Sequence, residues 1–377
     1  MLANLSEIPD GSKVYLRPVG CVSAGHLNCG SSLDFAGTGV RYAGAVVYAR
    51  CPATNVTSGY FSAQDLFKQM DDCSTTVHAA LRVQLDRLGS RRDSINLPTR
   101  KSLAFTKPLV MGVLNVTPDS FSDGGKFLDP ATAVRRARAM AAAGADIIDI
   151  GGESTRPGAT PVWEGEEADR IVPVIEAMAG EGVALSVDTR HSFVMEKALK
   201  AGADIINDVS ALSHDPDSMV FAASVSAPVI LMHAQGDPET MQDNPEYDHA
   251  LLDVYDYLSA RLDACVEAGI SADRIFLDPG IGFGKRVVQD NIALINGLSL
   301  FQTLGCPILL GASRKRFVGA ITGVDSAEDR VIGSVVAAAR GAQYGANIIR
   351  AHDVAQTVEA LKMVQAFTDA SVMDGVV

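Results

Sequence analysis

Short apolar runs alternate with longer amphipathic stretches over residues 108–370. Each apolar run is six to eight residues long and almost continuously aliphatic, as a strand must be when both faces of its sheet are covered. The stretches between the runs carry helical patterns of roughly 10 to 20 residues. This alternation predicts βαβ units and a parallel sheet. The eight expected strands are residues 109–116, 145–152, 184–189, 204–210, 228–234, 274–280, 307–313 and 346–352.

An internal repeat supports this number of strands. AGADIIDI begins at Ala143, AGADIIND begins two βα units later at Ala201, and a weaker copy, GANIIR, begins at Gly345. In each copy a glycine can end a helix, and the residues after it begin a buried strand. Eight such units in roughly 260 residues fit a closed barrel, whereas open doubly wound sheets more often hold five or six strands. No G-x-G-x-x-G follows the first strand, so we predict an α/β fold of the (β/α)8 TIM-barrel type.

The first hundred residues have a different pattern. Residues 13–19 and 40–49 are expected strands, and residues 71–89 are an expected helix with Asp72 or Ser74 near its cap. The polar stretch that follows, SRRDSINLPTRK, ends in a proline turn and is the expected linker. The expected domains are a small α+β extension of unknown role, residues 1–101, and a catalytic barrel, residues 102–377.

Composition and charge exclude several classes of protein. With 47% hydrophobic and 20% charged residues, a chain of 377 residues can bury a large core, which excludes disorder. Residues 108–377 hold 20 basic and 37 acidic residues, a net charge of −17, which gives no support to nucleic acid or an anionic membrane as a partner. The N-terminus lacks the features of a signal peptide, and no uncharged apolar run of 18 residues occurs, so we expect a cytoplasmic protein without a membrane span.

The six cysteines show no C-x-x-C pair, and in a reducing compartment most should be free thiols. Cys21, His26 and Cys29 lie close together in the sequence, with Cys51 further on. Structural zinc sites usually use tight cysteine knuckles, which are absent here, so we do not expect a zinc site.

Polar residues interrupt the apolar strands mainly at their carboxyl ends. In a barrel these ends meet at one face, which is the catalytic face. Any one of these residues could instead cap the next loop or helix. A buried unpaired carboxylate is costly, so residues that recur at this position on seven strands are expected to pair with one another or to face a ligand. They are Asn115, Asp188, Asn207, Asp208, His233, Asp278, Ser313, Arg350 and His352.

The residue types suggest the shape of the ligand. Asp188 and Asp278, with the amide of Asn207, suit a flat heterocycle that carries an exocyclic amine and ring N–H groups, such as a 2-amino-4-oxo pteridine. Lys315, just past the seventh strand, can reach a ring carbonyl or nitrogen. These residues therefore predict one side of a pterin site.

A second group of residues suggests a phosphate site. Arg156, Arg350 and His352 form an expected cationic group near the last helix, which opens with Asp353. Loops after the late strands, together with a helix N-terminus, are the usual phosphate site of this fold. Asn115 could supply an oxygen ligand to Mg²⁺, which commonly bridges substrate phosphates.

Three loops are distinguished by their composition. Residues 117–127 and 153–163 are rich in Gly, Pro, Ser and Thr and carry Phe121 and Trp163, so they are candidate lids, although surface loops have the same composition. Residues 278–285 form an expected glycine-rich turn after the sixth strand.

In these residues the sequence closely resembles the dihydropteroate synthase family. The resemblance covers residues 109–368, roughly 70% of the chain, and implies the same barrel. It implies condensation of 6-hydroxymethyl-7,8-dihydropterin pyrophosphate with 4-aminobenzoate, with Mg²⁺ assisting, in folate biosynthesis. It also implies a homodimer and an enzyme that belongs to a sulfonamide target family. The matching stretches, in family order, are MGVLNVTPDSFSDGG, GADIIDIGGESTRPGA, SVDT, IINDVSAL, MHAQGDPETMQ, LDPGIGFGK, GASRKRFVG and IIRAHDV.

The resemblance also implies a role for individual residues. Asp188, Lys315, Arg350 and His352 would be the catalytic residues. The residues that it implies are Asp188, Asn207, Asp278 and Lys315 for the pterin, Asn115 for magnesium and pyrophosphate, Arg350 and His352 for the diphosphate, Thr155, Arg156, Pro157 and Phe283 for 4-aminobenzoate, and Asp119 and Phe121 for a loop that closes over it.

Two other functions share part of this pattern. A pterin-binding methyltransferase that uses a methylated tetrahydrofolate could keep the carboxylates, but it would not need the STRPG loop or the SRK and RAHD segments. A non-catalytic pterin-binding protein would be expected to lose Asn115, Arg156, Lys315 or His352, and all four are present. Glycosidases and Schiff-base aldolases fit poorly, because the first need a carboxylate pair and the second a lysine on an inner strand.

Overall fold

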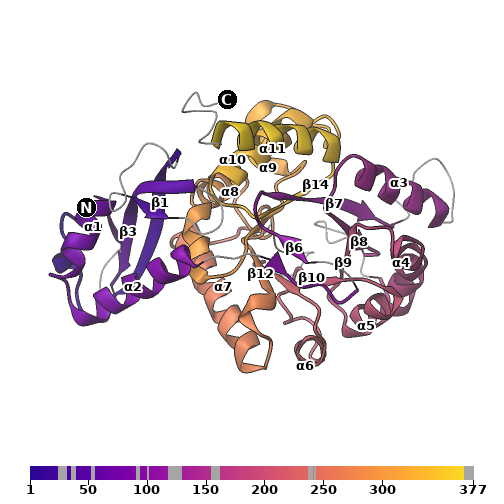
Figure 1. Cartoon of the computed structure of the whole chain (residues 1–377), viewed down its shortest axis with the longest axis horizontal. Coiled ribbons are helices and arrows are strands. Elements are labelled where there is room, and N and C mark those ends of the chain that lie inside the picture. Colours follow the sequence, from indigo (N-terminus) through magenta and orange to yellow (C-terminus); the bar gives the residue numbers. More distant parts are fainter. Residues whose placement is uncertain are drawn as a thin grey trace.

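Eight parallel strands form the central sheet of the computed structural model, in the order β12-β11-β10-β9-β8-β7-β14-β13. A parallel bridge between Leu277 and Ile308 joins the two ends of this order, so the sheet closes into a barrel (Figure 1). The structure describes residues 1–23, 32–34, 40–51, 56–90, 94–99, 102–117, 130–153, 162–236, 241 and 243–368. The strands are β7 (Leu109–Asn115), β8 (Ile147–Gly151), β9 (Ala184–Asp188), β10 (Ile205–Asp208), β11 (Val229–Met232), β12 (Ile275–Asp278), β13 (Leu309–Leu310) and β14 (Ile348–Ala351), which confirms the predicted (β/α)8 barrel.

Helices surround the barrel and bury their apolar faces against it. Gly144, Gly202 and Gly345 follow helices in the three copies of the repeat and have φ angles of 100°, 112° and 95°, which a residue with a Cβ rarely adopts. Their predicted role as helix ends is therefore confirmed. The helices are α3 (Pro130–Ala142), α4 (Glu164–Met178), α5 (Ser192–Ala201), α6 (Ser218–Ser224), α7 (Ala250–Glu267), α8 (Gln289–Asn296), α9 (Arg316–Thr322), α10 (Val331–Gln343) and α11 (Val354–Thr368), with 3-10 helices η4 (Ala272–Arg274) and η5 (Leu298–Leu304).

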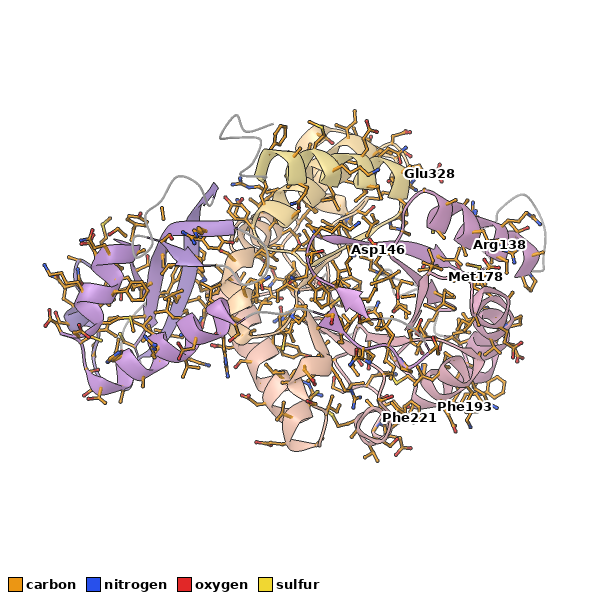
Figure 2. The ribbon with its side chains drawn as sticks, viewed as in Figure 1. Arg138, Asp146, Met178, Phe193, Phe221 and Glu328 are labelled. Carbon is orange, nitrogen blue, oxygen red and sulfur yellow. The ribbon has the colours of Figure 1, made fainter. Side chains whose placement is uncertain are left out.

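Polar residues also occur at the amino ends of the barrel strands, where they bind the backbone. Asp146, labelled in Figure 2, accepts a hydrogen bond of 2.8 Å from the backbone N–H of Val110. Asp204, its counterpart in the repeat, accepts one of 3.0 Å from Leu185 and another from the Thr99 hydroxyl. Asn347, in the weaker copy, accepts one of 2.8 Å from the backbone that leads into β13. These side chains join neighbouring strands at the end of the barrel away from the predicted site.

The N-terminal region is an antiparallel sheet with two helices. The two predicted strands are present, and β2 and β4, which the sequence pattern did not indicate, pair with β3. The helix begins later than predicted, because Ser74 caps it by accepting a hydrogen bond from the N–H of Val77. The core of the N-terminal region is separate from that of the barrel and includes Leu16, Tyr42 and Leu81. The elements are η1 (Leu5–Glu7), β1 (Lys13–Ser23), β2 (Leu33–Asp34), β3 (Val40–Arg50), β4 (Thr57–Ser62), α1 (Ala63–Met70) and α2 (Thr75–Gly89).

The segment between the two regions packs more closely than a polar linker would. Strands β5 (Ser94–Ile95) and β6 (Leu103–Ala104) form a short hairpin. Ile95, Leu97 and Phe105 join the core cluster formed by the first inward-pointing residues of the barrel strands. The hairpin therefore contributes apolar side chains to the end of the barrel away from the predicted site.

The N-terminal sheet lies beside α7 (Figure 1). Tyr15 and Tyr48 are buried in the core cluster of the barrel, and the Ser299 hydroxyl donates a hydrogen bond of 2.7 Å to the carbonyl of Pro18. Among the described residues, none of the helices combines the length and the apolar character that crossing a bilayer needs.

Candidate functional site

A cavity of about 540 Å³ lies at the carboxyl ends of the barrel strands. Asn115 and Asp188 are the last residues of β7 and β9, so both reach the cavity from strand ends. The loop after β12, the residues after β13 and the first turn of α9 complete its wall. Glu328, labelled in Figure 2, is also among its lining residues. The predicted pterin residues Asn207 and Asp278 are not among its lining residues. The structure thus brings together seven of the predicted residues: Asn115, Asp188, Phe283, Ser313, Lys315, Arg350 and His352.

Arg350 joins two buried carboxylates at this cavity. Its Nε donates to Asp149 Oδ2 at 2.6 Å, and its Nη2 donates to Asp188 Oδ2 at 2.7 Å. The Asn207 amide also donates to Asp149 Oδ2, at 3.1 Å. The two carboxylates raise the pKa of Arg350 further, so the guanidinium is charged and held between three strands. Its predicted contact with the diphosphate stays a prediction: Arg350 lines the cavity, and its Nε and Nη2 are bound to carboxylates.

Each of these two carboxylates has one oxygen, here called unmet, that has no hydrogen-bond partner in the described part of the chain. Asp149 Oδ1 and Asp188 Oδ1 are buried and accept no hydrogen bond from the described residues. Burial raises the pKa of Asp188, and the Arg350 charge opposes that change. An unmet buried acceptor costs about 1–3 kcal/mol, so both oxygens suit a ligand that donates N–H groups.

Asp278, at the end of β12, is held by the glycine-rich loop that follows it. Its Oδ1 accepts a hydrogen bond of 2.7 Å from the N–H of Gly280. Gly280 has a φ of 68°, and a Cβ there would lie 1.8 Å from the carbonyl oxygen of His233, so only glycine fits. Burial raises the pKa of Asp278 to about 6, with the Gly280 N–H and the Lys315 and Arg350 charges acting against it.

Lys315 and Phe283 lie together in the lining of the cavity. The Lys315 ammonium is 4.1 Å from the centroid of the Phe283 ring, a cation–π contact that holds both side chains. His352 contacts Ser313 through its backbone N–H and through Nδ1, both 3.1 Å from the Ser313 Oγ. Lys315, Phe283, Ser313 and His352 therefore line the same cavity in two contacting pairs.

A buried lysine that was given no role in the sequence lines the same cavity. The Lys285 ammonium donates to the carbonyls of Phe283 at 2.8 Å and Gly280 at 3.1 Å, and lies 2.8 Å from His233 Nδ1. Burial lowers the pKa of Lys285 to about 7, and it also lowers the pKa of His233, which is thus neutral. Lys285 connects the glycine-rich loop to the end of β11.

Asp208, predicted on the catalytic face, and Asp353, which opens the last helix, have structural roles. Asp208 points into its own loop, where it accepts hydrogen bonds from Ser210 at 2.7 and 2.6 Å and from the N–H of Leu212 at 3.0 Å. Asp353, the first residue of the helix expected beside the phosphate site, forms a bidentate ion pair with Arg314 at 2.7 and 3.0 Å. Both carboxylates have hydrogen-bond partners within the protein. For Asp208 this matches the alternative that a polar residue at a strand end caps the loop that follows.

Several predicted residues lie outside the described residues. These are Asp119 and Phe121 in one candidate lid, Thr155, Arg156 and Pro157 in the other, and His26 and Cys29 of the zinc alternative. Trp163 is the N-cap residue of α4. Cys51, Cys73, Cys265 and Cys306 are free thiols, and the described residues contain no group of three or more His, Cys, Asp or Glu that could hold a metal ion.

Asp149 is the main site residue that the sequence analysis missed. It occupies the same position in the first copy of the repeat as Asn207 does in the second, and the two side chains are hydrogen-bonded. Aligning the two copies would have identified it. Its position between isoleucines, before the end of the strand, concealed it.

Comparison with known proteins agrees with this geometry. A family model described as "Pterin binding enzyme" matches residues 111–352. The dihydropteroate synthase of Escherichia coli K12 is 46% identical over 270 residues, which span 71% of this chain and 95% of that protein. The dihydropteroate synthase of Neisseria meningitidis serogroup B is 48% identical over 272 residues, with the same coverage of both chains.

Solved structures show the same similarity. The Xanthomonas albilineans dihydropteroate synthase with 4-aminobenzoic acid is 45% identical, with a TM-score of 0.69 over 74% of this chain and 99% of that one. The Burkholderia cenocepacia enzyme with 7,8-dihydropteroate is 43% identical, with a TM-score of 0.67 over 74% and 98%. A Yersinia pestis enzyme in a sulfonamide drug complex is 46% identical, with a TM-score of 0.69 over 73% and 98%. All of these matches leave about a quarter of this chain uncovered.

Proposed function

The chain belongs to the pterin-binding enzyme family, among its dihydropteroate synthases, and on that basis we propose that it condenses 6-hydroxymethyl-7,8-dihydropterin pyrophosphate with 4-aminobenzoate. The products are 7,8-dihydropteroate and pyrophosphate, and the enzyme is a transferase of folate biosynthesis. Relatives have been solved with 4-aminobenzoic acid and with 7,8-dihydropteroate. The observation that carries the proposal is the pair of unmet carboxylate oxygens beside Arg350.

The carboxylates bind the pterin ring. Asp188, which lines the cavity, and Asp149, which shares Arg350 with it, accept hydrogen bonds through Oδ1 from the exocyclic amine and ring N–H groups. Asp278, close to the cavity-lining Gly311, accepts from a further edge of the ring. Lys315, held over Phe283, donates to the ring carbonyl or nitrogen. As the bond from the pterin methylene to the diphosphate breaks, positive charge develops on the ring, and the nearby carboxylates stabilise it.

The diphosphate departs on the side of His352 and Asn115. Both residues line the cavity, and His352 is oriented by Ser313. Asn115 offers a carboxamide oxygen, a ligand type that suits Mg²⁺, and substrate phosphate and water oxygens would complete the coordination of the ion. We propose that Mg²⁺, when bound there, neutralises charge on the leaving diphosphate. The residues that face 4-aminobenzoate are proposed to be Phe283 with Thr155, Arg156 and Pro157, and the loop with Asp119 and Phe121 is proposed to close over it.

Water must be kept from the electron-poor methylene while the amine of 4-aminobenzoate attacks it. Positioning of two substrates and exclusion of water supply most of the acceleration in such a step. The arylamine is a weak base, and we assign no general base. Sulfonamide drugs are proposed to compete for the same subsite, as the sulfonamide complex of the Yersinia pestis relative suggests.

The proposed assembly is a cytoplasmic homodimer. The four free thiols described above suit a reducing compartment. Helices α10 and α11 pack side by side and expose Ile332, Val336, Met363 and Phe367, which a second copy could cover. Sedimentation equilibrium tests the assembly: the mass of a single chain at micromolar concentration would contradict it.

The activity test uses the purified chain with the pterin pyrophosphate, 4-aminobenzoate and Mg²⁺. We expect pyrophosphate to be released in a one-to-one ratio with dihydropteroate. Release of pyrophosphate without a condensed product would show a different acceptor. Transfer of a methyl group from methyltetrahydrofolate to a cobalamin protein, with no dihydropteroate formed, would support the methyltransferase alternative.

A further inference from the structure

The family match begins at residue 111, yet the N-terminal sheet contacts a helix of the barrel through ionic and aromatic contacts. Arg50, the last residue of β3, donates from Nη2 to Asp253 Oδ1 at 2.5 Å and from Nη1 to Asp256 Oδ2 at 3.0 Å. The Tyr48 ring meets the ring of His249 edge-on, with centroids 5.6 Å apart. His249 is the N-cap residue of α7, and Asp253 and Asp256 lie in the first two turns of that helix.

Asp253 has a second contact, which fixes the beginning of that helix. Its Oδ2 accepts a hydrogen bond of 3.0 Å from the backbone N–H of His249, the N-cap residue of α7. Carboxylates in this position stabilise a helix N-terminus, because they bind N–H groups that have no partner within the helix. The Asp253 carboxylate therefore binds Arg50 through one oxygen and the start of α7 through the other.

Tyr247, two residues before the N-cap, connects this helix start to the cavity wall. Its hydroxyl donates a hydrogen bond of 2.5 Å to the carbonyl of Gly284. Its ring lies 5.9 Å from the Lys285 ammonium. Gly284 has a φ of 57°, and a Cβ there would lie 2.4 Å from the carbonyl oxygen of Gln235, so the loop is pressed closely against the segment after β11.

We propose that the N-terminal sheet is a positioning element for the substrate cavity. The contact between Arg50 and Asp253 fixes the start of α7, and Tyr247 holds the glycine-rich loop that carries Phe283 and Lys285 into the cavity. The part of the proposal that concerns substrates rests on the proposed function, whereas the part that concerns the order of the loop does not. Arg50 thus acts through Asp253 and Tyr247 and touches no substrate.

The test compares Arg50→Met with Lys13→Met in the full chain. Lys13 is a matched control, since its ammonium also contacts α7, at Asp256 Oδ1 (2.7 Å), but does not reach Asp253. Amide hydrogen exchange over residues 278–286 reads the loop, and steady-state kinetics read the substrates. For Arg50→Met we expect faster exchange in the loop and a KM for 4-aminobenzoate raised by about fivefold with kcat nearly unchanged. Lys13→Met should change neither quantity, and Arg50→Lys should restore part of both.

Tyr247→Phe tests the second link without altering the N-terminal contact. It should reproduce the faster loop exchange, and Arg50→Met should add little to it in the double variant, since the two act in series. Unchanged exchange over residues 278–286 in Arg50→Met, or an equal change in Lys13→Met, would overturn the proposal. If Arg50→Met fails to fold, normal loop exchange in Tyr247→Phe overturns it. A wild-type chain without synthase activity would refute the proposed function and leave the exchange results standing.

Discussion

The two ends of the barrel carry acids from the same repeat, but these acids have different surroundings. Asp146 and Asp204 lie at the amino ends of β8 and β10, and backbone N–H groups from neighbouring strands bind them. Asp149, three residues after Asp146, is the central residue of β8 and binds Arg350 of the cavity, and its buried Oδ1 accepts no hydrogen bond from the described residues. A buried acid is therefore structural where the protein completes its hydrogen bonds, and a candidate for binding where it does not.

The largest effect should come from the end of the barrel that holds the cavity, here called the open end. Asp188→Ala removes an acceptor for the pterin and a carboxylate beside the developing charge, so we expect kcat/KM to fall by about 10³-fold. The fold should survive, because Arg350 keeps its contact with Asp149. Steady-state kinetics and a circular dichroism melt measure both quantities. Near-normal turnover would refute the pterin assignment.

The amino ends of the strands, where the hairpin of β5 and β6 packs, form what we call the closed end. A change there should lower stability and leave activity unaltered. Asp204→Ala leaves the buried N–H of Leu185 and the Thr99 hydroxyl without their acceptor, which should lower the free energy of unfolding by about 2–3 kcal/mol. The folded fraction should keep its KM and kcat, because Asp204 lies at the amino end of β10, the end of the barrel away from the cavity. Urea denaturation with activity measured below the transition tests this. A large loss of kcat at unchanged stability would contradict the contrast between the two ends.

Asp278 gives the open end a pH dependence. Its pKa of about 6 means that the ionised acceptor is present above this pH and is lost as the pH falls. We expect kcat/KM for the pterin substrate to fall about tenfold per unit below pH 6. Asp278→Asn should have lower activity but lack this limb of the profile, and an unchanged limb would assign it to another group.

The same pKa has an opposite effect on stability. Between the usual pKa of an aspartate and about 6, the folded chain holds a proton that the unfolded chain has released. The contribution of Asp278 to the free energy of unfolding is therefore present at low pH and is lost as the pH rises through 6. Denaturation of the wild type and of Asp278→Asn should be measured from pH 4 to pH 7. The free energy of unfolding should fall less steeply with rising pH in the variant.

Much of this molecule can be predicted from its sequence. Strands buried on both faces are nearly continuous apolar runs, so the eight barrel strands were evident, and Asp188 and Asp278 stood out at the ends of such runs. The pairing of Arg350 with Asp149 could not be predicted, because these two residues are 201 positions apart in the sequence. Asp208 shows the reverse error, since a polar residue at a strand end can bind its own loop.

The role of the N-terminal sheet could not be predicted for the same reason. Arg50 and Asp253 are 203 residues apart in the sequence, and neither lies in a motif of the family resemblance. The hydrophobic pattern of the polar stretch after residue 90 is equally uninformative, because Ile95 and Leu97 are only two apolar residues in it. Contacts of this kind depend on tertiary packing and leave no local periodicity.

The central claim is that the unmet carboxylate oxygens bind the pterin, whereas the acids bound to the backbone are structural. Its most direct test is a calorimetric titration with the pterin pyrophosphate. It compares Asp149→Asn with Asp146→Asn, two identical changes three residues apart, the first in the middle of β8 and the second just before its amino end. We expect Asp149→Asn to raise the Kd by about tenfold or more, and Asp146→Asn to leave it equal to that of the wild type. Equal Kd values for the two variants would contradict the assignment of the unmet oxygens to the pterin.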